Sequence, residues 1–167
     1  MEREKVLEIL NRYAMYCARR EYLLCRHDEL LAMRNDLKRS AVEDAVHITQ
    51  GYGSGGGSGR ISNPTERLAI MFASGEVPDT VRDVEAAAEE CEDEIREIVP
   101  VIRSVDAWMK CLSDRERLVV EYKEVRGETW TEVLKRYEAT FPGEIFSKRA
   151  LRCKRDQAIT RICDVAM

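Results

Sequence analysis

Apolar residues recur at helical spacing near the start of the chain. Two adjacent series repeat every seven residues and together form one stripe along a long helix. We therefore expect a helix from Arg3 to Leu37 within an N-terminal region, residues 1–50. Its stripe must be buried, either against other parts of the chain or across a homodimer through the N-terminal helices. The first series is Ile9, Tyr16, Leu23, Leu30 and Leu37, and the second is Leu10, Cys17, Leu24 and Leu31.

A glycine- and serine-rich segment, GYGSGGGSGR, interrupts this pattern at residues 51–60. Chain of this composition behaves as a flexible coil and cannot pack a core. A phosphate-binding P-loop would need a strand before the first glycine and a Lys-Ser/Thr pair after the last one. Neither feature is present, so we interpret residues 51–61 as a linker.

A middle helical region is expected from residue 62 to residue 111. Ser62 or Asn63 can cap a helix with Pro64 in its first position, and Gly75 can end that helix. Apolar steps of three and four residues then continue from Val81 to Val105, which predicts a long third helix.

The third helix is acidic and contains Pro100, which predicts a kink or a break there. Ten acidic residues and two arginines lie between Glu76 and Glu97. Such a face is usually a solvated surface. A docking surface for a basic partner is the functional alternative.

Helix signals become dense in the last part of the chain, residues 112–167. Ser113 with Glu116, and Thr129 with Glu132, have the spacing of capping boxes that open two short helices. Arg126-Gly127-Glu128 separates these helices, and Ser147 can cap a final basic helix. The order is that of a helix-turn-helix with one supporting helix in front. Its predicted core is Leu118, Tyr122, Trp130, Val133, Leu134, Leu151, Ala158 and Ile162.

The final helix concentrates positive charge, although the whole chain has a net charge of −4. Six basic residues and one acid lie between Ser147 and Arg161. A basic helix can lie in the major groove and contact phosphates and base edges. At 100° per residue from Leu151, Arg149 points away from the core and Arg155 lies near the buried side. The candidate DNA-binding residues are Ser147, Lys148, Arg149, Arg152, Lys154 and Arg155. A merely solvated basic face is the alternative interpretation.

Several segments of the sequence resemble a known family. The segment LSDRERLVVEYKEVRGETWTEVLKRY resembles the first two helices of sigma factor region 4, and SKRALRCKRDQAITRI resembles the third. The RinA/ArpU group of phage late-gene regulators is similar in its long N-terminal helices, its middle helix start near Ser62 to Glu66, and its C-terminal region-4-like module. The resemblance implies a phage or prophage protein in the bacterial cytoplasm. Such a protein would bind double-stranded DNA at late-gene promoters and act with host RNA polymerase.

Three other functions are weighed against a DNA-binding regulator. An enzyme is disfavoured because the two histidines, His27 on the apolar stripe and His47 before the linker, fit no catalytic or metal-binding spacing. We therefore expect no catalytic residue, metal or cofactor. A phage small terminase subunit also joins a helix-turn-helix to long helices, but usually carries it at the N-terminus. A protein-only interaction module, for example one that binds RNA polymerase, predicts no affinity for DNA.

The remaining sequence features bear on the cellular compartment of the protein. Six cysteines lie at positions 17, 25, 91, 111, 153 and 163, without a CxxC pair, and are interpreted as reduced thiols in a cytosol. The segment MEREKVLEIL is charged and is not a signal peptide. No apolar run approaches the ~18 residues that a membrane span needs. The expected fold class is all-α, with long N-terminal helices and a C-terminal three-helix helix-turn-helix module.

Overall fold

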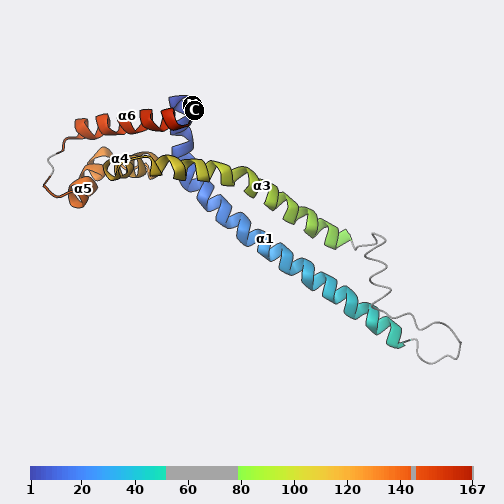
Figure 1. Cartoon of the computed structure of the whole chain (residues 1–167). Helices are drawn as coiled ribbons and strands as arrows, with labels where there is room; N and C mark the ends of the chain where they lie inside the picture. The colour runs from blue at the N-terminus through green and yellow to red at the C-terminus, as the bar shows by residue number, and fades with distance from the viewer. Residues whose placement is uncertain (52–78, 144–145, 167) are drawn as a thin grey trace. The chain divides into compact units, whose positions relative to one another are not determined.

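The computed structural model describes residues 1–51, 79–143 and 146–166. Every regular element in these ranges is helical, which confirms the all-α prediction (Figure 1). Most of the expected linker, and the helix expected to start near Ser62, lie outside the described residues. The elements are α1 (Arg3–Gly51), α3 (Asp79–Lys110), α4 (Asp114–Val120), the π-helical turn η1 (Glu121–Val125), α5 (Trp130–Thr140) and α6 (Lys148–Val165).

The two long helices extend further than their patterns predicted. Helix α1 continues beyond Leu37 to Gly51. Helix α3 continues through Pro100, so the break expected there does not occur. The Ser104 hydroxyl donates a hydrogen bond to the Pro100 carbonyl at 2.9 Å, one turn further along. A proline removes one donor from a long helix, and the neighbouring turns of α3 are enough to carry the helix past it.

The chain divides into two compact units, each described here by itself. The first combines Met1–Glu21 with Arg96–Met167, and the second is Tyr22–Ile95. The start of α1 thus belongs with the C-terminal helices, whereas the sequence pattern grouped it with the rest of the N-terminal region. This grouping depends on contacts between residues more than 90 positions apart, which periodicity along the chain does not reveal.

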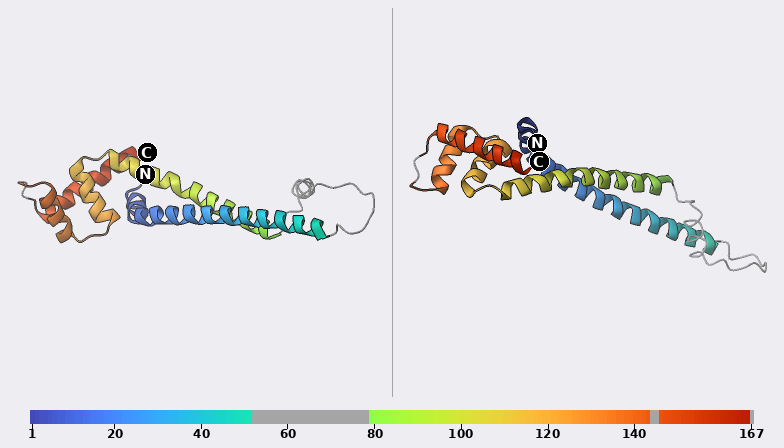
Figure 2. Two further views of the ribbon diagram at one scale, coloured as in Figure 1. Left: turned by 90° about the horizontal axis from the view of Figure 1, so that it is seen from below. Right: turned by 45° about the horizontal axis from the view of Figure 1, so that its top comes forward.

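One core of the first unit joins the start of α1 and the end of α3 to α6. Figure 2 shows these segments in two further views. Tyr13 on α1 also donates a hydrogen bond to Asp106 on α3, with 2.6 Å between the oxygens, and this bond raises the pKa of Tyr13. The buried members are Val6, Leu10, Val105, Trp108, Leu112, Val120, Ala158, Ile159 and Ile162.

A second core of the same unit lies between α4, α5 and α6. Tyr137 is fully buried in it, and its ring centre lies 4.9 Å from that of Phe141 and 4.6 Å from that of Phe146. Its buried members are Leu118, Val119, Val133, Tyr137 and Leu151, with Tyr122, Trp130, Leu134, Phe141 and Phe146 packed around them. Since α6 contributes to both cores, its two buried sides fix which of its faces points to solvent.

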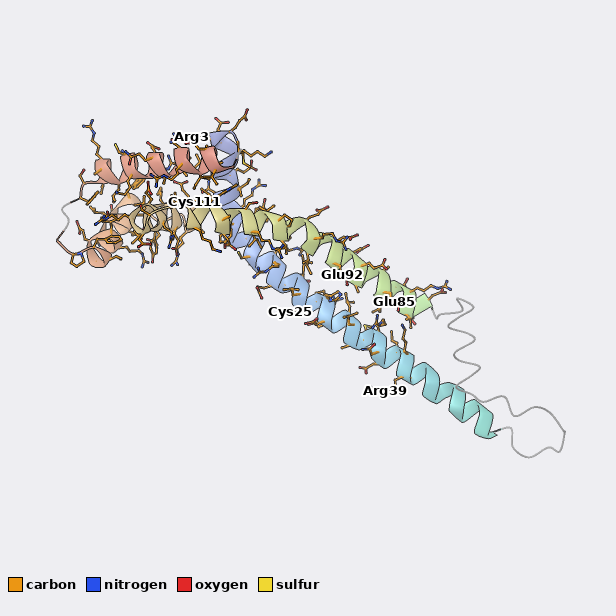
Figure 3. The ribbon with its side chains drawn as sticks, viewed as in Figure 1. Arg3, Cys25, Arg39, Glu85, Glu92 and Cys111 are labelled. Atoms are coloured by element: carbon orange, nitrogen blue, oxygen red, sulfur yellow. The ribbon has the colours of Figure 1, made fainter. Side chains whose placement is uncertain are left out.

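In the second unit, stretches of α1 and α3 pair along their length. Leu23 and Leu30 of the predicted stripe are buried, whereas Leu24 of the second series is 42% exposed. A helix of 3.6 residues per turn rotates away from an exact seven-residue repeat, so only part of a two-series stripe can face one partner helix. Side-chain contacts join the helices: a hydrogen bond between His27 Nε2 and the Glu92 carboxylate at 3.0 Å, and an ion pair between Lys38 and Glu85 at 2.8 Å. Figure 3 labels Glu85 and Glu92 on α3.

Among the helices of the described residues, none has a stretch apolar and long enough to cross a membrane.

Candidate nucleic-acid interface

The candidate interface begins where α6 starts. Ser147 has an extended backbone, and its hydroxyl accepts a hydrogen bond from the Ala150 amide at 3.2 Å, which confirms the expected cap. The first turn of α6 contains no acid, whereas α4 begins with Asp114 and Glu116 and α5 with Glu132. Helix N-termini carry a partial positive charge and favour anions. The start of α6 therefore adds cations where the helix itself is already positive.

Three predicted contact residues extend from the exposed side of α6. Lys148, Arg149 and Arg152 are all exposed. Lys148 Nζ donates to the Thr131 hydroxyl of α5 at 2.8 Å. Within the described part of the chain, none of the three cations forms an ion pair with a carboxylate. They form a positive surface that no described carboxylate neutralises through an ion pair.

Trp130 holds two cations near the same surface. The Arg152 guanidinium carbon lies 5.7 Å from the centre of the indole ring, and Lys123 Nζ of η1 lies 5.5 Å from it. Lys123 also donates to the Glu128 carbonyl at 2.9 Å. Trp130 is only half-buried, so it is both a packing residue of the second core and part of the cationic surface.

Arg155 has a different environment from the cations before it. Its Nε donates to Glu124 at 2.8 Å and its NH1 donates to Asp156 at 3.1 Å. Burial lowers the pKa of Arg155, but the hydrogen bonds and charges of Glu124 and Asp156 outweigh burial and leave its pKa raised. Asp156 also pairs with Arg3 of α1. The donors of Arg155 thus hold α6 against η1. Lys154 is half-buried and lies over the Phe146 ring at 5.5 Å.

A second buried carboxylate anchors the far part of α6. Glu116 accepts from the Ser113 amide at 3.0 Å and hydroxyl at 2.7 Å, and from Arg161 at 2.8 Å. Burial raises the pKa of Glu116, but the Ser113 hydrogen bonds and the charges of Arg161 and Lys154 outweigh it and leave the pKa lowered. One side chain therefore completes the capping box of α4 and also pairs with α6.

The predicted core residues lie inward, to different degrees. Tyr122, Trp130 and Leu134 are half-buried, because they border the second core instead of filling it. Ala158 and Ile162 belong to the core shared with α1 and α3. The buried members of the prediction are Leu118, Val133, Leu151, Ala158 and Ile162.

Sequence reasoning missed the residues contributed by η1. The helix after Ser113 was expected to run uniformly to Val125, but it widens to a π-helical turn in which the Arg126 amide donates to the Glu121 carbonyl at 3.0 Å. This turn carries Glu124 and Lys123. A glutamate or lysine in a short helix is ordinarily exposed, so neither residue gave a signal.

The arrangement is suited to binding an anion. Within the described ranges, no three His, Cys, Asp or Glu side chains are grouped so that they could hold a metal ion. The cysteines are free thiols; Cys153, beside Arg152, is exposed. The surface offers a row of exposed cations on a helix whose other sides are fixed by two cores and by ion pairs with Glu124, Glu116 and Arg3.

Comparison with known proteins finds no matching family, no matching curated protein and no matching solved structure.

Proposed function

We propose that this protein is a sequence-specific DNA-binding transcriptional regulator that contacts duplex DNA through the exposed start of α6. In this proposal α4, α5 and α6 act as a helix-turn-helix module, and α6 is the helix that enters the major groove. Lys148, Arg149 and Arg152 contact phosphates and base edges. Arg155 and Lys154, which were also candidates for DNA contact, have a supporting role because their neighbours are other parts of the protein.

The observation that carries the proposal is the charge at the start of α6. Cations there oppose the helix dipole and repel each other, which costs stability in the free protein. The first turns of α4 and α5 follow the opposite, stabilising pattern. A polyanion that binds at this position removes both penalties, since its phosphates favour the helix N-terminus and the cations alike.

The biological setting is proposed from the sequence resemblance alone. A regulator similar to the RinA/ArpU group would act in the bacterial cytoplasm at phage late-gene promoters, together with host RNA polymerase. Exposed acids on α3, such as Glu89 and Glu90, offer a surface for a basic partner in that setting.

A titration of the purified protein with duplexes from its own genomic upstream regions tests the proposal. At two salt concentrations, we expect one preferred duplex and an affinity that falls as salt rises, because phosphate contacts release counterions. Absence of binding at low salt to every duplex would contradict it and would favour a protein-only partner.

A further inference from the structure

The cations around Trp130 are held in place without being neutralised. An aromatic ring attracts a cation through its quadrupole but contributes no net negative charge. Lys123 and Arg152, from two different elements, lie within 6 Å of the centre of the same indole ring. Ion pairs elsewhere in this unit bring a cation and a carboxylate together, so their charges cancel. At Trp130, two positive charges converge and both remain.

Among the described residues, neither of the acids that flank Trp130 in the sequence, Glu128 and Glu132, forms an ion pair with these cations. The Glu128 carboxylate pairs with Arg136 at 2.8 Å, and the Glu132 carboxylate accepts from the Thr129 amide and hydroxyl at 2.8 Å each. The hydrogen bonds to Thr129 lower the pKa of Glu132 and bind it to its own helix start. Because Glu132 already occupies the N-terminus of α5, the positive end of that helix is not available to another anion. The side-chain cations alone define the site.

A third cation extends this arrangement along α6. Lys148 is held by the Thr131 hydroxyl, one residue after Trp130. Lys123, Lys148 and Arg152 are thus each restrained by a contact with α5, and none of them forms an ion pair with a described carboxylate. Side chains restrained in advance lose less conformational entropy when they bind. Arg149 has no such restraint from the described residues.

We infer that Lys123 and Arg152, held by the Trp130 ring, and Lys148, held by Thr131, form a clamp for the phosphodiester backbone of duplex DNA, separate from the base-reading role proposed for Arg149. We call this group the Trp130 clamp. The inference rests on the proposed function and deepens it, because it assigns a sequence-independent contact to a lysine outside α6. Phosphate contacts fix position and orientation and carry no sequence information themselves.

The test measures how the affinity of Lys123→Gln for a mixed-sequence duplex depends on salt. Lys5→Gln, which removes the same charge from an exposed position on α1, is the matched control. We expect the Lys123→Gln variant to bind every duplex several-fold more weakly, with the slope of log affinity against log salt reduced by about one. Lys5→Gln should match the wild type in both quantities.

The ring is tested separately from the charge. Trp130→Leu removes the quadrupole and should weaken duplex binding, whereas Trp130→Phe keeps an aromatic face and should recover much of the lost affinity. Thermal unfolding of both variants identifies any loss caused by unfolding alone. Equal affinity of the folded leucine and phenylalanine variants would overturn the role of the ring.

The results distinguish a failure of the Trp130 clamp from a failure of the proposed function. If Lys123→Gln keeps the wild-type salt slope while Arg149→Ala weakens binding, the clamp is wrong and DNA binding through α6 stands. If the wild-type protein binds no duplex at low salt, both are wrong.

Discussion

Arginines lie both in the first two turns of α6 and in the part of the helix that follows, but their surroundings differ. Arg149 and Arg152 are exposed and form no ion pair with the described residues. Arg155, less than one turn further, has a side chain 23% exposed and pairs with Glu124, whose side chain is 7% exposed. Arg161 pairs with the equally buried Glu116.

The difference separates two uses of arginine on one helix. A buried carboxylate without a partner is costly, so Arg155 and Arg161 stabilise the fold by pairing with Glu124 and Glu116. The charges of Arg155 and Arg161 are thus paired with carboxylates, and these ion pairs hold α6 in place. The charges at the start of α6 have no such use within the described residues and remain available to an anion.

The largest effect is expected for Arg155→Ala. Removing this guanidinium leaves Glu124 buried without its partner, which should reduce the free energy of unfolding by about 3 kcal/mol. Arg152→Ala should change it by at most about 1 kcal/mol, the size of an exposed cation–π contact such as the one with Trp130. Chemical denaturation of both variants makes the comparison. Equal stability of the two would show that the ion pair with Glu124 does not anchor α6.

Arg149→Ala should change DNA binding without reducing stability, whereas Arg155→Ala should reduce stability. If its side chain contacts a base, its loss should weaken binding to the preferred duplex by ~1–3 kcal/mol and relax sequence preference at one position. Its exposed position, and the removal of a cation from the positive end of the helix, predict an unchanged or slightly higher free energy of unfolding. Titrations with the preferred duplex and with single-base variants measure both. Wild-type affinity for all of them would remove Arg149 from the base-reading role.

Arg149→Glu tests whether the cations at the start of α6 oppose the helix dipole. An acid in the first turn of α6 should stabilise the free protein by about 0.3–1 kcal/mol, because it meets the positive end of the helix. The same change should weaken DNA binding more than Arg149→Ala does. A melting curve and a titration on one sample suffice. Lower stability of the variant would contradict the claim that function, and not folding, explains cations at this end.

Acidification should act on the anchored part of α6. Glu116 and Asp156 have lowered pKa values in the folded protein. Their contribution is therefore complete above the unfolded pKa values, about 4.3 for Glu and 3.9 for Asp, and is lost as pH falls through the lower folded values.

Melting curves recorded from neutral pH to about pH 3 measure this contribution. Glu116→Gln should be less stable at neutral pH and should lose less stability on acidification than the wild type. A parallel pH dependence of the two proteins would assign the acid sensitivity to other groups.

Local features of the fold could be predicted from the sequence. The capping boxes at Ser113 and Thr129 and the cap at Ser147 depend on residues three positions apart, and the structure has all three. The inward direction of Leu151 and the outward direction of Arg149 follow from helical geometry alone.

Features that depend on distant contacts could not be predicted. Glu116 was recognised as a capping residue, but its burial requires Arg161, 45 positions away. Glu124 is buried only because η1 widens to a π-helical turn and Arg155 lies opposite. The packing of Val6 and Leu10 with α6 likewise brings the two ends of the chain together. Of the candidate site, the exposed cations could be predicted, whereas the ordering of Lys123 by Trp130 could not.

An amide NMR titration of the protein with its preferred duplex tests most directly whether the start of α6 contacts DNA. We expect resonances of residues 147–152 to shift first and furthest, with those around Lys123 and Trp130 next, while those of residues 22–40 change little. Shifts confined to residues 22–40 and 79–95, with the start of α6 unchanged, would contradict this contact.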